Sequence, residues 1–183
     1  GQGYLSGKQM GGSFQFLHSR DLVWTRQMRE YLMGERDQGN DLMAWNADTT
    51  RLPARMHHEY LVALYLKNAL ANGRYAAGGR RVSLGDLNMP VFLVGTERDH
   101  VSPWRSVYKL HQLTGTEISF LLTSGGHNAG IISPPGHPRR SYRLRNQSKG
   151  SQWLSMDEWL ATAESFEGSW WPAWQAWLAA HSS

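Results

Sequence analysis

Met89-Pro90-Val91-Phe92-Leu93-Val94-Gly95-Thr96-Glu97-Arg98-Asp99-His100 is one of two places in this sequence where an apolar run ends in a polar turn. The other is Ile118-Ser119-Phe120-Leu121-Leu122-Thr123-Ser124-Gly125-Gly126-His127-Asn128-Ala129-Gly130. Short apolar runs bounded by turn residues predict buried strands. Each turn carries a side chain suited to proton transfer, Asp99 in the first and His127 in the second.

The segment between the two runs predicts a helix. Ser102-Pro103 is typical of an N-cap followed by proline at the first helical position, and apolar residues recur after it at helical spacing. A helical crossover allows the flanking strands to lie parallel, which brings both turns to the same carboxyl edge of the sheet. Side chains from different loops converge on ligands at that edge. The sequence therefore predicts an α/β fold in which Asp99 and His127 meet.

The chain lacks a nucleophile to accompany this pair. An acid followed by a histidine matches the last two members of an α/β-hydrolase triad, whose nucleophile precedes them on a strand-to-helix elbow. No serine before Asp99 has the Gly-x-nucleophile-x-Gly pattern, since Gly12-Ser13 lacks both the strand and the second glycine. The chain has 0 Cys, which excludes a thiol nucleophile on it. We therefore expect the carboxyl-terminal part of a larger enzyme.

The composition is that of a folded globular chain, with 183 residues, 40% hydrophobic residues and 9 Trp. No apolar run approaches the roughly 18 residues of a membrane span, and the first ten residues lack a signal-peptide pattern, so we expect neither a span nor export. Without Cys, no disulfide or thiolate metal site forms on the chain. His57 and His58 have no third ligand at a sensible spacing, so we expect no metal site.

A basic cluster consists of Arg139, Arg140, Arg143 and Arg145. The formal net charge is +4, but the other basic residues are scattered among acids, so we do not expect nucleic acid as a partner. We interpret the cluster as a solvated loop. The alternative is contact with a phosphate-bearing substrate, because arginine pairs bidentately with phosphate oxygens.

Caps and turn residues predict the remaining elements. These are a helix capped by Ser19 and ending at Gly34, a helix from about Ala54 to Leu70, a turn at Gly78-Gly79, a polar loop that ends at Ser151, a helix opened by the capping box Ser155-Met156-Asp157-Glu158, and a final helix from about Ser169. Trp170, Trp174 and Trp177 of the final helix are spaced to share one side, which favours core packing over a ligand platform.

These motifs resemble those of one known family, the poly(3-hydroxyalkanoate) synthases, and in particular the class I type. The matching stretches are Gly3-Tyr4-Leu5-Ser6-Gly7, Asp41-Leu42-Met43-Ala44-Trp45-Asn46-Ala47-Asp48-Thr49-Thr50-Arg51-Leu52-Pro53-Ala54-Arg55-Met56-His57, Glu97-Arg98-Asp99-His100-Val101-Ser102-Pro103-Trp104, Gly126-His127-Asn128-Ala129-Gly130-Ile131-Ile132-Ser133-Pro134-Pro135 and Gly168-Ser169-Trp170-Trp171-Pro172. They occur over almost the whole chain, in the family's order and spacing.

The resemblance implies the C-terminal part of an α/β-hydrolase fold. Residues 1–82 would form a cap segment with returning helices, and residues 83–183 part of the catalytic core, with a cysteine nucleophile upstream of this chain. Asp99 matches the family's catalytic acid and His127 its base, while His100 and Asn128 are candidate substrate-binding residues. Asn128 stands where the family has an apolar side chain, and Ser133 where it has asparagine, which predicts a subgroup with different pocket packing.

The implied activity is that of an acyltransferase, which polymerises (R)-3-hydroxyacyl-coenzyme A into polyester, releases coenzyme A and needs no further cofactor. The implied partners are this substrate, the growing polyester and the missing amino-terminal half of the enzyme. Two or three strands would leave an apolar sheet face and edge uncovered, so we also expect either self-association as a homodimer or dependence on the missing half. The implied location is cytoplasmic, at the surface of polymer granules. Two alternatives stay open: an esterase or depolymerase with an upstream serine, and a non-catalytic piece that binds a partner half or the polymer surface.

Overall fold

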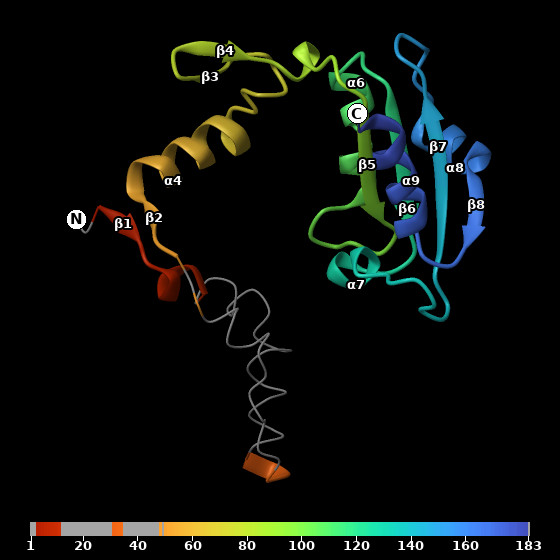
Figure 1. Ribbon diagram of the computed structural model, residues 1–183. Helices are drawn as coiled ribbons and strands as arrows, with labels where there is room; N and C mark the ends of the chain where they lie inside the picture. The colour runs from red at the N-terminus through yellow and green to blue at the C-terminus, as the bar shows by residue number, and fades with distance from the viewer. Residues whose placement is uncertain (1–2, 12–30, 35–47, 49, 183) are drawn as a thin grey trace. The chain divides into compact units, whose positions relative to one another are not determined.

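The computed structural model describes residues 3–11, 31–34, 48 and 50–182. The chain divides into two compact units, Gly1–Ala69 and Leu70–Ser183 (Figure 1). The helix predicted from Ser19 lies largely outside the described residues, as does most of the motif at 41–53. No helix in the described ranges is both long and apolar enough to cross a bilayer.

The first unit contains a short antiparallel strand pair and a helix. β1 (Tyr4–Leu5) pairs with β2 (Leu52–Pro53), and α4 (Ala54–Tyr60) continues directly as the π-helix η3 (Leu61–Leu66). The start of the predicted helix at Ala54 is confirmed, but helical structure ends at Leu66 rather than at Leu70. Asn68 has φ 46°, a left-handed conformation that asparagine tolerates and that a right-handed helix cannot include.

The second unit begins with a hairpin, in which β3 (Tyr75–Ala77) pairs antiparallel with β4 (Arg80–Val82), followed by the 3₁₀ helix η4 (Leu84–Asp86). The turn predicted at Gly78-Gly79 is confirmed, and both glycines have positive φ, as a two-residue hairpin turn requires. The predicted boundary at residue 82 falls at the end of β4, whereas the compact units divide after Ala69. The division into cap and core remains a prediction.

A four-stranded sheet forms the centre of the second unit, in the order β5-β6-β7-β8 (Figure 1). Its strands are β5 (Val91–Thr96), β6 (Ile118–Thr123), β7 (Ser141–Gln147) and β8 (Glu164–Glu167). β5 and β6 are parallel, with Val91 opposite Ile118 and Thr96 opposite Thr123. Both predicted strands and the parallel pairing are therefore confirmed. The crossover between them consists of α5 (Trp104–Val107) and α6 (Leu110–Leu113).

Helices cover both faces of this sheet. On one face, Phe120 of β6 lies 5.2 Å from Tyr108 and 4.7 Å from Trp159, measured between ring centroids. Trp159 belongs to α8 (Met156–Thr162), which opens with the predicted capping box. On the other face, α9 (Trp171–His181) packs through Trp177, whose ring lies 5.5 Å from that of Phe92. Because side chains alternate along a strand, Phe92 points away from the face that Val91 and Leu93 line.

The tryptophans of the final helix differ in burial. Trp170 is 6% exposed and Trp174 is 41% exposed, although their rings lie 5.9 Å apart. Core packing is therefore confirmed for Trp170, and Trp177 packs on β5, but Trp174 lies partly at the surface.

The parallel character of the sheet ends at β6, which corrects the sequence prediction. The predicted polar loop up to Ser151 is wrong, because it contains β7, which pairs antiparallel with both β6 and β8. Arg143 Nη1 donates to Leu160 O at 3.0 Å, and Arg145 Nη1 to Thr162 O at 3.3 Å. These carbonyls lie at the end of α8, where cations stabilise the helix dipole. Arg143 and Arg145 therefore belong to a strand and bond to α8. The interpretation of the cluster as a solvated loop is wrong for these two residues.

The predicted cap at Ser102 is also wrong. Helix α5 begins at Trp104 with Pro103 before it, and no side chain caps it. Instead, the backbone N–H of Ser102 donates to Asp99. The predicted single helix is interrupted after Val107, where Lys109 N bonds to Ser106 O in a tighter turn.

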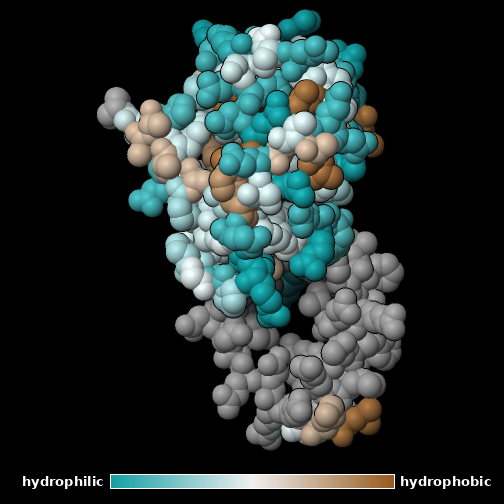
Figure 2. Space-filling view, turned by 90° about the vertical axis from the view of Figure 1, so that its right-hand side faces the viewer, coloured by the Kyte–Doolittle hydropathy of each residue, from teal (hydrophilic) through white to brown (hydrophobic). Residues whose placement is uncertain are grey.

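The β8 edge of the sheet is charged. Glu164, Ser165 and Glu167 are exposed along this short strand, and the face in Figure 2, over β8 and α8, is mostly hydrophilic with small apolar patches. Charged, short edge strands discourage pairing with another chain. A homodimer through this edge is therefore disfavoured, and self-association elsewhere remains a prediction.

We predict that Phe120→Ala lowers the free energy of unfolding by about 3–5 kcal/mol, because it empties the space beside the rings of Tyr108 and Trp159. Urea unfolding followed by tryptophan fluorescence measures the change. Leu178→Ala, at a position that is 38% exposed, is the control and should cost far less. Equal losses in the two variants would contradict this account of the core.

Candidate active site

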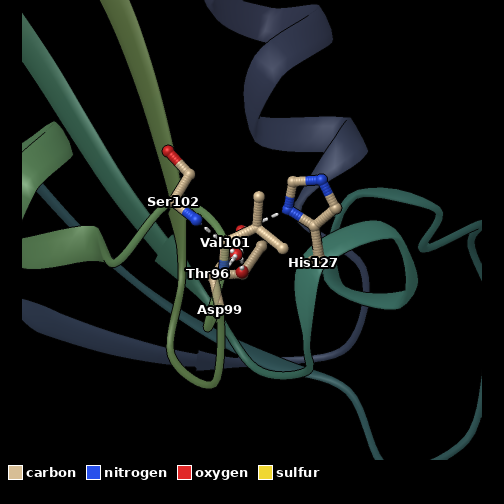
Figure 3. Close-up of polar contacts among 5 residues, drawn as sticks. All are labelled: Thr96, Asp99, Val101, Ser102 and His127. Atoms are coloured by element: carbon tan, nitrogen blue, oxygen red, sulfur yellow. Dashed lines mark hydrogen bonds and ion pairs between the residues drawn. The ribbon is translucent and has the colours of Figure 1, made fainter. Parts of the chain in front are cut away.

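The parallel pairing of β5 and β6 places their following turns side by side. Asp99 lies in the turn after β5, and His127 is the first residue of α7 (His127–Ile131), which follows β6. His127 Nδ1 is 2.8 Å from Asp99 Oδ2 (Figure 3). The predicted meeting of these two side chains is therefore confirmed.

The Asp99 carboxylate has four hydrogen-bond donors. Oδ1 accepts the backbone N–H groups of Val101 at 2.9 Å and Ser102 at 2.8 Å, while Oδ2 accepts the Thr96 hydroxyl at 3.2 Å and His127 Nδ1 (Figure 3). The side chain is only 7% exposed. Burial by itself would raise the pKa of Asp99, but the hydrogen bonds from Ser102, His127 and Val101 and the charge of His127 outweigh it and lower the pKa to about 2.

This ionised carboxylate determines the tautomer of His127. An ionised carboxylate only accepts hydrogen bonds, so Nδ1 of His127 carries the proton and Nε2 has a free lone pair in the neutral ring. Figure 3 shows Nε2 on the side of the ring away from Asp99, and the side chain is 44% exposed. The arrangement can accept a proton at Nε2 from a group that approaches the sheet edge, and Asp99 stabilises the resulting imidazolium.

Two glycines allow α7 to lie close to the end of β5. A Cβ added at Gly130 would come within 2.6 Å of Thr96 Cγ2. Gly125 has φ +115°, and a Cβ there would come within 2.8 Å of the Gly130 Cα. Only glycine fits at these positions, so Thr96 can reach Asp99 while its methyl group packs on α7.

Side chains at and just before the start of α9 contact the carboxyl end of α7 and the residues that follow it. Trp170 Nε1 donates to Gly130 O at 3.2 Å, Trp171 Nε1 donates to Ile131 O at 3.0 Å, and the Ser169 hydroxyl donates to Ser133 O. Sequence reasoning missed these contacts because it interpreted the tryptophans as apolar bulk. It also missed Thr96, whose position three residues before Asp99 was the available signal.

His100 and Asn128 are each next in the chain to one member of the pair, and both are exposed. Asn128 lies in the first turn of α7, where its carbonyl accepts the N–H of Ile132 at 3.0 Å. Contact of either side chain with substrate remains a prediction. In the described ranges, no three His, Asp or Glu side chains are grouped so that they could hold a metal ion.

Known proteins are similar to this chain over almost its whole length. The poly(3-hydroxyalkanoate) polymerase subunit PhaC of Rhizobium meliloti is 38% identical over 96% of the chain, and the poly(3-hydroxyalkanoate) polymerase of Methylorubrum extorquens is also 38% identical over 96%. The PhaC subunit of Cupriavidus necator is 36% identical over the same share. The chain spans only 28–29% of the length of these relatives. No protein-family model matches the chain.

We predict that the hydrogen bonds to Asp99 make stability depend on pH in the acid range. The folded-state pKa of about 2 lies below the ordinary value, so the unfolded chain binds more protons as the pH falls. The stabilisation is fully present above about pH 4 and is lost as the pH falls towards 2. Asp99→Asn should flatten this part of a plot of urea midpoint against pH. A carboxyl resonance of Asp99 that titrates near pH 4 would contradict the prediction.

We also predict that Gly130→Ala destabilises the fold by about 1–3 kcal/mol, because its methyl group overlaps Thr96. The Nδ1 proton resonance of His127 should shift or broaden as α7 moves. Gly115→Ala is the matched control, since a Cβ there has nothing within 4 Å. If both variants unfold at the same urea concentration, the close contact between Gly130 and Thr96 is contradicted.

Proposed function

We propose, from the premise that this chain is homologous to the poly(3-hydroxyalkanoate) polymerases over 96% of its length, that it is the carboxyl-terminal part of such a polymerase. Its relatives are three to four times longer, which fits a part rather than a whole enzyme. In this proposal the complete protein is an acyltransferase that joins (R)-3-hydroxyacyl groups from coenzyme A thioesters into polyester.

The observation that carries the proposal is the hydrogen bond between Asp99 and His127, with Nε2 of His127 left accessible. In the first half-reaction, Nε2 takes the proton of a cysteine thiol, the thiolate attacks the thioester carbonyl, and coenzyme A leaves with a proton. In the second, Nε2 takes the proton of a hydroxyl group, the alkoxide attacks the acyl-cysteine, and the ester forms as the thiol is released. Both steps require the base within about 2.6–3.2 Å of the proton.

The sheet offers a place for the part that carries the cysteine. β5 pairs only with β6 in the described residues, so one of its edges is open. The strand is apolar, with Val91, Phe92, Leu93 and Val94 in succession, which is typical of an interior strand of a parallel sheet. We propose that upstream strands continue the sheet along β5 and bring the nucleophile to the edge that holds His127. This arrangement would complete an α/β-hydrolase fold.

We propose the finer assignments by analogy with the same family. Residues 1–82 would belong to the cap and residues 83–183 to the catalytic core. His100 and Asn128 would contact the substrate beside the pair. The polymerase would act at the surface of a polyester granule in the cytoplasm, with the growing polymer as its second partner.

We predict that His127→Ala in the full-length protein abolishes coenzyme A release from 3-hydroxybutyryl-coenzyme A, because no base remains at the sheet edge. Asp99→Asn should slow it by roughly 10⁴, by analogy with serine enzymes that lose the orienting carboxylate. His137→Ala is the control, since His137 is exposed and bonds only locally to Pro138 O at 2.8 Å. Near-normal release by the His127 variant would reject the assignment.

The alternatives give different results in the same assay. An upstream serine esterase or depolymerase would hydrolyse the polyester and form none from the thioester. A non-catalytic binding piece would leave turnover unchanged in both variants. The isolated chain should release no coenzyme A, because it contains no cysteine that could act as the nucleophile.

A further inference from the structure

His127 begins a helix that is too short to be stable by itself. Helix α7 spans five residues, and its internal bonds are few, with Gly130 N bonding to Gly126 O at 2.8 Å and Ile132 N to Asn128 O at 3.0 Å. Isolated helices shorter than about 12 residues are marginal in water. The orientation of the His127 ring therefore depends on contacts that other elements make with α7.

Contacts with the carbonyls at the end of α7 come mainly from a segment about 40 residues later. Gly130 O accepts from Trp170 Nε1 at 3.2 Å and from the Thr123 hydroxyl at 3.4 Å, and Ile131 O accepts from Trp171 Nε1 at 3.0 Å. The last carbonyls of a helix have no partner within it, so these donors satisfy groups that would otherwise be open.

The donors are themselves fixed in place. Trp170 is 6% exposed, and the backbone N–H of Trp171 donates to the Ser169 hydroxyl oxygen at 3.1 Å. Two turns further along α9, Trp177 packs on Phe92 of β5. Helix α9 is thus anchored on the same strand that leads to Asp99, and it bonds to the helix that begins with His127.

We propose that Trp170 and Trp171 are positioning residues for His127, acting through their indole N–H groups on the Gly130 and Ile131 carbonyls. Neither indole N–H bonds to the Asp99–His127 pair; both fix α7 relative to β5, so that Nδ1 of His127 stays within hydrogen-bond distance of Asp99. The consequence for catalysis rests on the proposed function, whereas the consequence for the hydrogen bond does not.

The test replaces each indole by a ring without the donor. Trp170→Phe and Trp171→Phe are made in the 183-residue chain and in the full-length protein. In the chain, the downfield Nδ1 proton resonance of His127 should broaden and exchange faster with solvent. In the full-length protein, kcat for coenzyme A release should fall about tenfold, in line with the cost of small misplacements, while KM changes little.

Replacement of Trp177 by 3-benzothienylalanine is the matched control on the same helix, because it keeps the bicyclic ring that packs on Phe92. Its Nε1 is buried and has no hydrogen-bond partner in the described part of the chain, so this change removes an N–H group without removing a hydrogen bond. The resonance and kcat should stay as in the parent protein. If the Trp170 and Trp171 variants match the Trp177 variant in both measurements, the proposal is overturned.

Two further results separate the explanations. If a phenylalanine variant does not fold, 3-benzothienylalanine at that position keeps the bicyclic shape and lacks only the N–H group, and an unchanged His127 resonance there overturns the proposal. If the resonance responds as expected but the full-length parent protein has no polymerase activity, the positioning role stands and the proposed function fails.

Discussion

The need to satisfy a buried negative charge governs the edge of this sheet. An ionised carboxylate removed from water is costly unless donors surround it. Asp99 obtains them from two backbone amides of its own turn, from a hydroxyl at the end of β5 and from the ring of His127. The turn wraps around the carboxylate, the α5 helix starts later than a serine cap would place it, and the imidazole is fixed in one tautomer. One charge thus determines both the local backbone and the proton-accepting atom.

The central strands and the pairing of Asp99 with His127 could be predicted because short-range signals suffice for them. An unbroken apolar run indicates a strand buried on both faces, and two such runs joined by a helix place their turns together. The capping box at Ser155 is similarly local, because its two partners are three residues apart.

The strands β7 and β8 could not be recognised in the same way. Arg143 and Arg145 make Ser141–Gln147 read as polar, and only the α8 carbonyls that accept their hydrogen bonds explain why such a segment is a strand. Its alternation of apolar and basic residues was a usable signal, since a half-buried strand has that period. The contacts of Trp170 and Trp171 left no such signal, because an indole buried as bulk and an indole that donates a hydrogen bond look alike in sequence.

The proposed dependence of α7 on Trp170 and Trp171 at the start of α9 has a consequence for how the site forms during translation. A nascent chain that has already left the ribosome with both members of the pair does not yet have the indoles that bond to the last carbonyls of α7. A premature stop shortly after β8 would leave Asp99 and His127 in the polypeptide and still remove this support. On this proposal, the orientation of His127 would therefore be fixed only after the start of α9 has been synthesised.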